Sequence, residues 1–201
     1  IVETKQENGW KMTPEGFESA MSPATKMLIL NSPSNPTGAV YSKEELQAIG
    51  DICAGEDILI ISDEVICGFG RTGNWWGFET MGFEPDIVPM AKGLSSGYLP
   101  IGAVAFADHL VKDFFELGGE FYHGMTYAGH PVACAVALKN IEIIEQEKLV
   151  ERTAEIGPYF AQALASLRDH PIRFLRRSLE RRGAVPCAEL AAIGRRAPHA
   201  M

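Results

Sequence analysis

Two side chains in this sequence, an amine and a carboxylate, have surroundings suited to covalent and acid–base chemistry. Lys92 lies in the run Met-Ala-Lys-Gly-Leu-Ser-Ser-Gly (90–97), between an apolar stretch and a Gly/Ser loop. A lone lysine in a loop is usually solvated surface. Burial would instead lower the pKa of the amine and leave it free to attack an aldehyde. We therefore expect Lys92 to be buried if it does chemistry.

The carboxylate, Asp63, directly follows the apolar run 57–62. In open parallel sheets, ligands bind beyond the carboxyl ends of the strands. A carboxylate at such an end can keep the ring nitrogen of pyridoxal 5'-phosphate (PLP) protonated, which this cofactor needs in order to act as an electron sink. Val65, two residues further on, can lie against the ring. The alternative is that Asp63 merely caps a loop.

A third candidate is the hydroxyl group of Thr126, which stands just before the sequence Gly-His-Pro (129–131). Proline is favoured at the first position of a helix, and the N-terminus of a helix favours phosphate. Thr126 is therefore a candidate phosphate contact. A simple helix-capping role is the alternative.

The elements that must position these side chains alternate between strand and helix. Two apolar runs without polar alternation, 26–31 and 57–62, are typical of strands buried on both faces of a parallel sheet. Ser42 and Glu45 form a capping-box pattern that opens a helix between them. We expect further strands at 86–90 and 101–107, and helices at 131–147 and 149–167. The sequence thus predicts an α/β fold with an open, mostly parallel sheet and flanking helices.

Composition narrows the range of partners and compartments. The 201 residues carry a net charge of −8, which argues against nucleic acid or an anionic membrane as the general partner. The four cysteines include no CxxC pair and the five histidines no HxxxH, so the sequence predicts neither a disulfide framework nor a metal site. A cytoplasmic location fits this pattern best. No apolar stretch is long enough for a membrane span.

Four ordered motifs resemble one family. They are Asp-Glu-Val-Ile-Cys-Gly-Phe-Gly-Arg-Thr-Gly (63–73), Pro-Asp (85–86), Ala-Lys-Gly-Leu-Ser-Ser-Gly-Tyr-Leu-Pro-Ile-Gly (91–102) and His-Gly-Met-Thr-Tyr-Ala-Gly-His-Pro (123–131). Together they resemble the class III aminotransferases of the amine–pyruvate and omega-amino acid kind. The resemblance implies the large-domain core of the fold type I PLP-dependent transferases. It also implies Asp63 at the pyridine nitrogen, Val65 against the ring and Lys92 as the Schiff-base lysine. Thr126 would reach the phosphate of the partner subunit in a homodimer.

The first fifty residues resemble a different branch. The segments 2–14 and Asn-Ser-Pro-Ser-Asn-Pro-Thr-Gly (31–38) are similar to class I aspartate aminotransferases, in which the Asn of the second motif bonds the phenolic oxygen of PLP. The resemblance implies that role for Asn35. Two class I features are missing, because Ile66 replaces an expected Tyr and Pro100 an expected phosphate-binding Arg. We expect a class I-like segment at 1–50 and a class III-like PLP-binding core at 51–171.

The remaining residues, 172–201, form a basic tail of different composition. Its seven arginines and two acidic residues give +5, against −13 for the rest of the chain. We interpret the tail as an anomalous segment rather than a domain, the product of a shifted reading frame. A basic interaction tail is the alternative.

The function implied by the resemblance is transamination between an amine or omega-amino acid and a 2-oxo acid such as pyruvate. Neither family's full site is present, because the class III phosphate loop and the carboxylate-binding Arg have no counterpart in this sequence. A non-catalytic fragment or chimera that retains the PLP-fold core is therefore the main alternative. Another PLP reaction, such as racemisation or decarboxylation, is a third.

Overall fold

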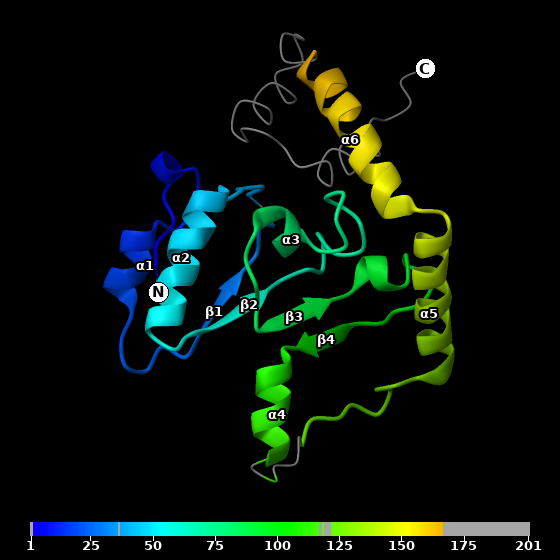
Figure 1. The fold of residues 1–201 in the computed structure, drawn as a ribbon, viewed down its shortest axis with the longest axis horizontal. Helices are drawn as coiled ribbons and strands as arrows, with labels where there is room; N and C mark the ends of the chain where they lie inside the picture. Colours follow the sequence, from blue (N-terminus) through cyan, green and yellow to red (C-terminus); the bar gives the residue numbers. More distant parts are fainter. Residues whose placement is uncertain (1, 36, 117, 119–121, 167–201) are drawn as a thin grey trace.

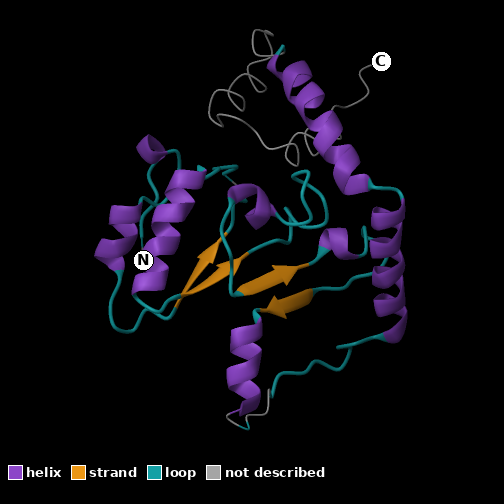
Figure 2. Ribbon diagram, viewed as in Figure 1, coloured by secondary structure: helices purple, strands orange, loops and turns teal. Residues whose placement is uncertain are grey.

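A four-stranded sheet organises the part of the chain that the computed structural model describes, residues 2–35, 37–116, 118 and 122–166. Its strands lie in the order β1 (Met27–Leu30), β2 (Leu59–Ser62), β3 (Ile87–Met90) and β4 (Ala103–Phe106) (Figures 1 and 2). β1, β2 and β3 run parallel, and β4 runs antiparallel to β3. The predicted α/β fold with a mostly parallel sheet is confirmed.

Helices connect and flank the strands; the helices that begin after Ser42, at Pro131 and at Leu149 were predicted from the sequence, and the others were not. The helix between β1 and β2 begins with a capping box, in which Ser42 Oγ accepts from Glu45 N at 3.2 Å and Glu45 Oε2 accepts from Ser42 N at 2.7 Å. The long helix after the Gly-His-Pro sequence starts at Pro131, as predicted. The helical elements are η1 (Gln6–Asn8), α1 (Pro14–Ala20), α2 (Lys43–Gly55), α3 (Gly77–Met81), η2 (Lys92–Leu94), α4 (Asp108–Glu116), α5 (Pro131–Gln146) and α6 (Leu149–Ala165).

The main hydrophobic core lies between one face of β1 and β2 and the helices α1 and α2. Leu46 and Ile49 of α2 are almost completely buried there against Leu30 and Ile60 of the strands. Phe17 of α1 closes the outer side of the same core. This face of the sheet is therefore the well-packed one.

The other face of β1 is open, which corrects our expectation of strands buried on both faces. Met27 and Ile29 are 51% and 66% exposed, and β2 alternates between half-buried and buried residues. Every residue of β4 is exposed. The physical reason is that α1 and α2 both cover the same face, and the described residues supply no second helical layer to β1.

The basic tail predicted at 172–201 lies outside the described residues. Among the described residues, no helix combines the length and the apolar character that a bilayer crossing requires.

We predict that the core under α2 carries much of the stability of this chain. Ile49→Ala should lower the free energy of unfolding by about 2–5 kcal/mol, because it leaves a cavity at a fully buried position. The matched change Ile29→Ala, on the open face of β1, should cost less than about 1 kcal/mol. Urea unfolding followed by circular dichroism measures both, and equal losses for the two variants would contradict this assignment of the core.

Candidate functional site

The carboxyl ends of β2 and β3 bring the candidate carboxylate and amine to one edge of the sheet. The two strands are parallel neighbours, with Ile61 in register with Ile87. Beyond their ends, Glu64 N donates to Pro89 O at 3.0 Å, which continues the pairing past Asp63. Asp63 follows β2 directly and Lys92 follows β3 after one residue. The topology therefore delivers both to the edge where ligands bind in parallel sheets.

Asp63 is held by a hydrogen bond to the neighbouring strand β1 and by a second one within its own turn. Its backbone N donates to Leu30 O of β1 at 2.8 Å. One carboxylate oxygen, Oδ1, accepts from Val65 N at 3.1 Å, so Asp63 caps the turn that follows β2. Asp63 and Val65 are both half-buried. The loop-capping role is thus present in the structure, and it occupies one oxygen of the carboxylate.

Lys92 has an uncommon backbone conformation and an exposed side chain. Its φ angle is +43°, in the left-handed region, where a non-glycine residue carries a strain of about 1–3 kcal/mol. The condition stated from the sequence, that Lys92 is buried if it does chemistry, is not met within the described residues. The described residues fix the backbone around Lys92 but do not cover its side chain. Among them, no ion pair joins Lys92 to Asp63, so the amine and the carboxylate do not neutralise each other.

A buried carboxylate, Glu64, stabilises the segment that carries Asp63. Its side chain is 2% exposed and accepts hydrogen bonds from Gly77 N at 2.8 Å, Phe78 N at 3.0 Å and Ser62 Oγ at 3.1 Å. Desolvation by burial raises the pKa of Glu64, and the hydrogen bonds from Gly77 and Phe78 oppose that rise. Glu64 thereby ties the end of β2 to the start of α3.

The glycine-rich loop 68–76 packs closely against α6 on one side and against Gly93 on the other. A Cβ at Gly70 would lie 3.0 Å from Val150 Cγ2 of α6, and one at Gly73 would lie 3.1 Å from Ala154 Cα. On the other side, a Cβ at Gly93 would come within 2.9 Å of Phe69 Cβ. These close approaches explain why glycine is needed at these positions, and they connect the loop to the residue that follows Lys92.

Thr126 and Asn35 both lie in exposed loops. Thr126 begins the turn 126–129, and the N-cap of α5 is His130, whose Nδ1 accepts from Ala133 N at 3.4 Å. The alternative that Thr126 caps this helix is therefore wrong. Asn35 follows the carboxyl end of β1, where its backbone N donates to Asn31 Oδ1 at 2.8 Å. Asn35 therefore lies beyond the carboxyl end of β1, at the same edge of the sheet as Asp63.

Two cavities lie at opposite ends of the strands. One of ≈ 670 Å³ is lined by 99–103 and by loop residues 123–125 and 127–130, and reaches Ala133 and Cys134 of α5. Because Met90 pairs with Ala103, this cavity is at the Lys92 end of β3.

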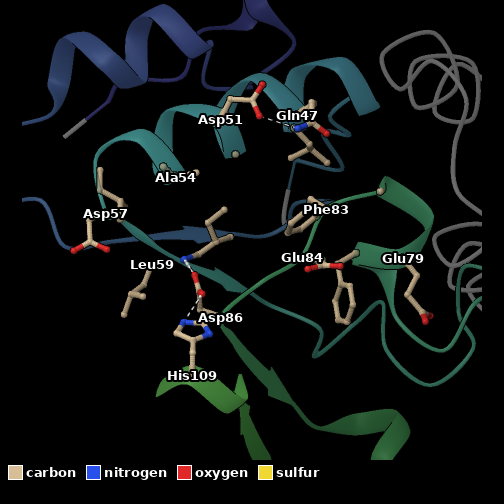
Figure 3. A pocket seen from close by; sticks show the side chains of 17 residues that line it. Gln47, Asp51, Ala54, Asp57, Leu59, Glu79, Phe83, Glu84, Asp86 and His109 are labelled. Carbon is tan, nitrogen blue, oxygen red and sulfur yellow. Dashed lines mark hydrogen bonds and ion pairs between the residues drawn. The ribbon is translucent and has the colours of Figure 1, made fainter. Parts of the chain in front are cut away.

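The other cavity, of ≈ 820 Å³, is at the amino ends of β2 and β3. In Figure 3, Asp86 lies there between the β2 backbone and His109, with Oδ2 accepting from Ile60 N at 2.7 Å and Oδ1 3.1 Å from His109 Nε2. We assign the site to the carboxyl ends, although the cavity there is smaller.

Two residues near the candidate site were not singled out from the sequence. Asn140 lies on the buried stripe of α5, among apolar residues. A polar residue within an apolar period is a sign of a buried hydrogen bond, and that rule would have pointed to Asn140. Glu64 had no such signal, because its burial beyond Ile60 and Ser62 is visible only in the structure.

Comparison with known proteins identifies the family of this chain. The family model described as "Aminotransferase class-III" matches residues 27–197, and the chain belongs to that family. The match begins inside segment 1–50, and the comparisons show no class I resemblance for that segment.

Individual relatives and solved structures are aminotransferases by name. The putrescine–pyruvate aminotransferase of Pseudomonas aeruginosa is 54% identical over 125 residues, which cover 62% of this chain and 27% of that protein. The chloroplastic gamma aminobutyrate transaminase 3 of Solanum lycopersicum is 44% identical over 140 residues, 68% of this chain and 26% of that protein. The crystal structure of an S-selective transaminase from Bacillus megaterium superposes with a TM-score of 0.71 at 34% identity, covering 78% of this chain and 33% of that one. The chain spans about a quarter of the length of these curated relatives.

We predict that Glu64 makes stability fall as pH rises. Because its folded pKa is raised above the unfolded value, the native state binds more protons than the unfolded state between those two values. Its contribution is therefore full below the unfolded pKa, about 4.3, and is lost as pH rises through the folded pKa. Glu64→Gln should remove this slope. It should also destabilise the fold at low and neutral pH, since one amide oxygen cannot replace two carboxylate oxygens.

Urea unfolding of both proteins between acid and neutral pH measures this difference. Glu84→Gln, which removes an exposed carboxylate near α3, is the matched control. In this variant, the free energy of unfolding should fall with rising pH as steeply as in the wild type. If Glu64→Gln keeps that slope as well, Glu64 is not its source.

Proposed function

We propose that this chain forms the PLP-binding core of an aminotransferase that exchanges an amino group between an amine or omega-amino acid and a 2-oxo acid such as pyruvate. Membership of the class III family supports the reaction type. The 54% identity to a putrescine–pyruvate aminotransferase supports an amine as donor and pyruvate as acceptor. The structural observation that carries the proposal is the arrival of Asp63 and Lys92 at the carboxyl ends of adjacent parallel strands.

The residues at this edge fit PLP chemically. Asp63 keeps one carboxylate oxygen beyond its turn-capping bond, and an acidic oxygen is what a protonated pyridine nitrogen requires. Lys92 offers an amine that no carboxylate of the described residues holds in an ion pair. Val65 would provide the apolar contact with the ring. When bound, PLP supplies an electron sink for the carbon next to the substrate nitrogen.

Lys92 has two roles in this proposal. Its Nζ would first hold the cofactor covalently. Once the amino donor has displaced it, the free amine would move a proton from the donor carbon to a carbon of the cofactor, first as a general base and then as a general acid. Both roles need a neutral amine, which exclusion of water favours. Because Lys92 is exposed in the described chain, we propose that a working site requires a cover from elsewhere.

A second subunit is the cover that we propose. Thr126 lies in an exposed loop beside the cavity at the Lys92 end of β3, which suits a hydroxyl that reaches the phosphate bound by a partner subunit. The functional form is then a homodimer. Asn35, at the end of β1, would contact the phenolic oxygen of PLP within its own chain.

A non-catalytic core is the second candidate function, and one observation favours it: the side chain of Lys92 is exposed. In this form the chain would bind PLP weakly and turn nothing over. Three further statements stay predictions of the sequence. They are the division into 1–50, 51–171 and the tail 172–201, the class I origin of the first segment, and a cytoplasmic location.

We predict that PLP followed by borohydride reduction labels Lys92. The wild-type protein should give a single major pyridoxyl-modified peptide containing Lys92, identified by mass spectrometry. Lys92→Ala should abolish the label and slow the half-reaction with a diamine by at least about 10²-fold, the smaller end of a general acid–base contribution. The matched control is Lys112→Ala, an exposed lysine of α4, which should change neither.

The outcomes separate the two candidates. Label on Lys92 with amino-group transfer supports the aminotransferase, and label without transfer supports the non-catalytic core. Modification spread over surface lysines, with none preferred, would exclude a PLP site at this edge.

We further predict that the PLP-loaded, active form is at least a dimer. Light scattering on the loaded protein should give at least twice the mass of the 21.9 kDa chain. Thr126→Val should weaken PLP binding, because it removes a hydroxyl donor to a charged phosphate, a bond of about 1.5–3 kcal/mol. Full activity in a monomeric fraction would contradict the shared site.

A further inference from the structure

One polar residue interrupts the apolar stripe of α5. Ala133, Ala137 and Ile144 are the buried residues of this helix, and Asn140 falls between the last two at helical spacing. Asn140 is half-buried, whereas Lys139 beside it is exposed. A polar amide at such a position destabilises a packed helix unless it finds hydrogen-bond partners.

The partners of the Asn140 amide are the backbone carbonyl groups of the two residues after Lys92. Asn140 Nδ2 donates to Gly93 O at 2.8 Å and to Leu94 O at 3.2 Å, across 47 and 46 residues of sequence. Both partners are acceptors, so the two N–H bonds of one amide nitrogen are matched to two carbonyl oxygens. The green helical turn η2 lies beside α5 in Figure 1.

Other contacts hold the same turn from different sides. Phe69 packs against Gly93 so closely that a Cβ added at Gly93 would lie 2.9 Å from Phe69 Cβ. Ser95, 2% exposed, donates from Oγ to Leu99 O at 2.6 Å. Within the turn, Leu94 N donates to Ala91 O at 3.0 Å and Ser95 N to Lys92 O at 3.3 Å. The turn is therefore anchored while the Lys92 side chain stays exposed.

We propose that Asn140 is a positioning residue that keeps Lys92 in its left-handed backbone conformation and so directs its amine to the site. A left-handed non-glycine residue persists only when its surroundings determine it, and α5 reaches this turn through the Asn140 amide. Without the two bonds, Lys92 can relax to a negative φ angle. The benefit to catalysis rests on the proposed function, but the effect on the backbone does not.

The test compares Asn140→Ala with Ile144→Val by NMR on the protein without PLP. Ile144→Val trims the same buried stripe and destabilises α5 without removing the amide. In Asn140→Ala, the Cα and Cβ chemical shifts of Lys92 should move away from left-handed values. The amides of Leu94 and Ser95 should exchange about tenfold faster, since about two modest hydrogen bonds are lost. In Ile144→Val, the Lys92 shifts should stay as in the wild type.

Unchanged Lys92 shifts in Asn140→Ala would overturn the proposal, as would equal changes in the Ile144→Val control. If Asn140→Ala does not fold, Asn140→Asp keeps the size of the side chain and removes both donors. Failure of both variants to fold would also overturn the proposal, because Asn140 would then determine the fold rather than the position of Lys92.

A second readout separates this inference from the proposed function. Where the wild-type protein takes up PLP on Lys92, Asn140→Ala should slow the formation of the borohydride-reducible adduct by about tenfold, the loss expected from about two hydrogen bonds. Unslowed adduct formation alongside shifted Lys92 resonances would refute the directing role. If the wild type takes up no PLP at Lys92, the proposed function fails, and the NMR comparison still decides the backbone role.

Discussion

The parallel pairing of β2 with β3 is the constraint on which the site depends. Ile61 lies in register with Ile87, and the bond from Glu64 N to Pro89 O extends the pairing to the point where both strands end. A slip of one residue in β2 would turn Asp63 to the opposite face of the sheet, because side chains alternate along a strand. The position of Asp63 relative to Lys92 is therefore set mainly by backbone hydrogen bonds and only secondarily by their side chains.

Three of the six non-glycine residues with positive φ angles in the described part of the chain lie beside that pairing. Lys92 and Ser96 have positive φ angles in the segment after β3, and Phe69, which packs on Gly93, has one in the facing loop. Such conformations survive only where packing and hydrogen bonds determine them, and they are common at functional sites. Beside Lys92, the Asn140 amide donates hydrogen bonds to Gly93 O and Leu94 O, and Phe69 packs on Gly93.

The sequence predicted the elements well because their signals are local. The capping box of Ser42 and Glu45, and Pro131 at the start of α5, each determine a helix start within a few residues. The expectation that both apolar runs are buried on two faces was wrong, because burial of a strand depends on which layers cover it, and no local pattern states that. Met27 and Ile29 look like core residues in sequence and lie on the open face of β1.

The candidate site residues were recognisable from sequence motifs, whereas their arrangement in space was not predictable. Asp63 and Lys92 stand out because each follows an apolar run, and the topology explains why they reach one edge. The exposure of Lys92 was not predictable, since cover for a side chain comes from segments distant in sequence or from another subunit. Glu64 and Asn140 act through partners 13 and 47 residues away, which a linear pattern does not reveal.

The central claim is that Asp63 and Lys92 of one chain hold a single PLP molecule, and a crystal structure of the protein soaked with PLP tests it most directly. Our account predicts electron density continuous between Lys92 Nζ and the cofactor, with the pyridine nitrogen about 2.7–2.9 Å from the Asp63 carboxylate, the range of a charge-assisted hydrogen bond. PLP bound at the amino ends of the strands, beside Asp86 and His109, would contradict the account. So would density on Lys92 with the ring nitrogen turned away from Asp63.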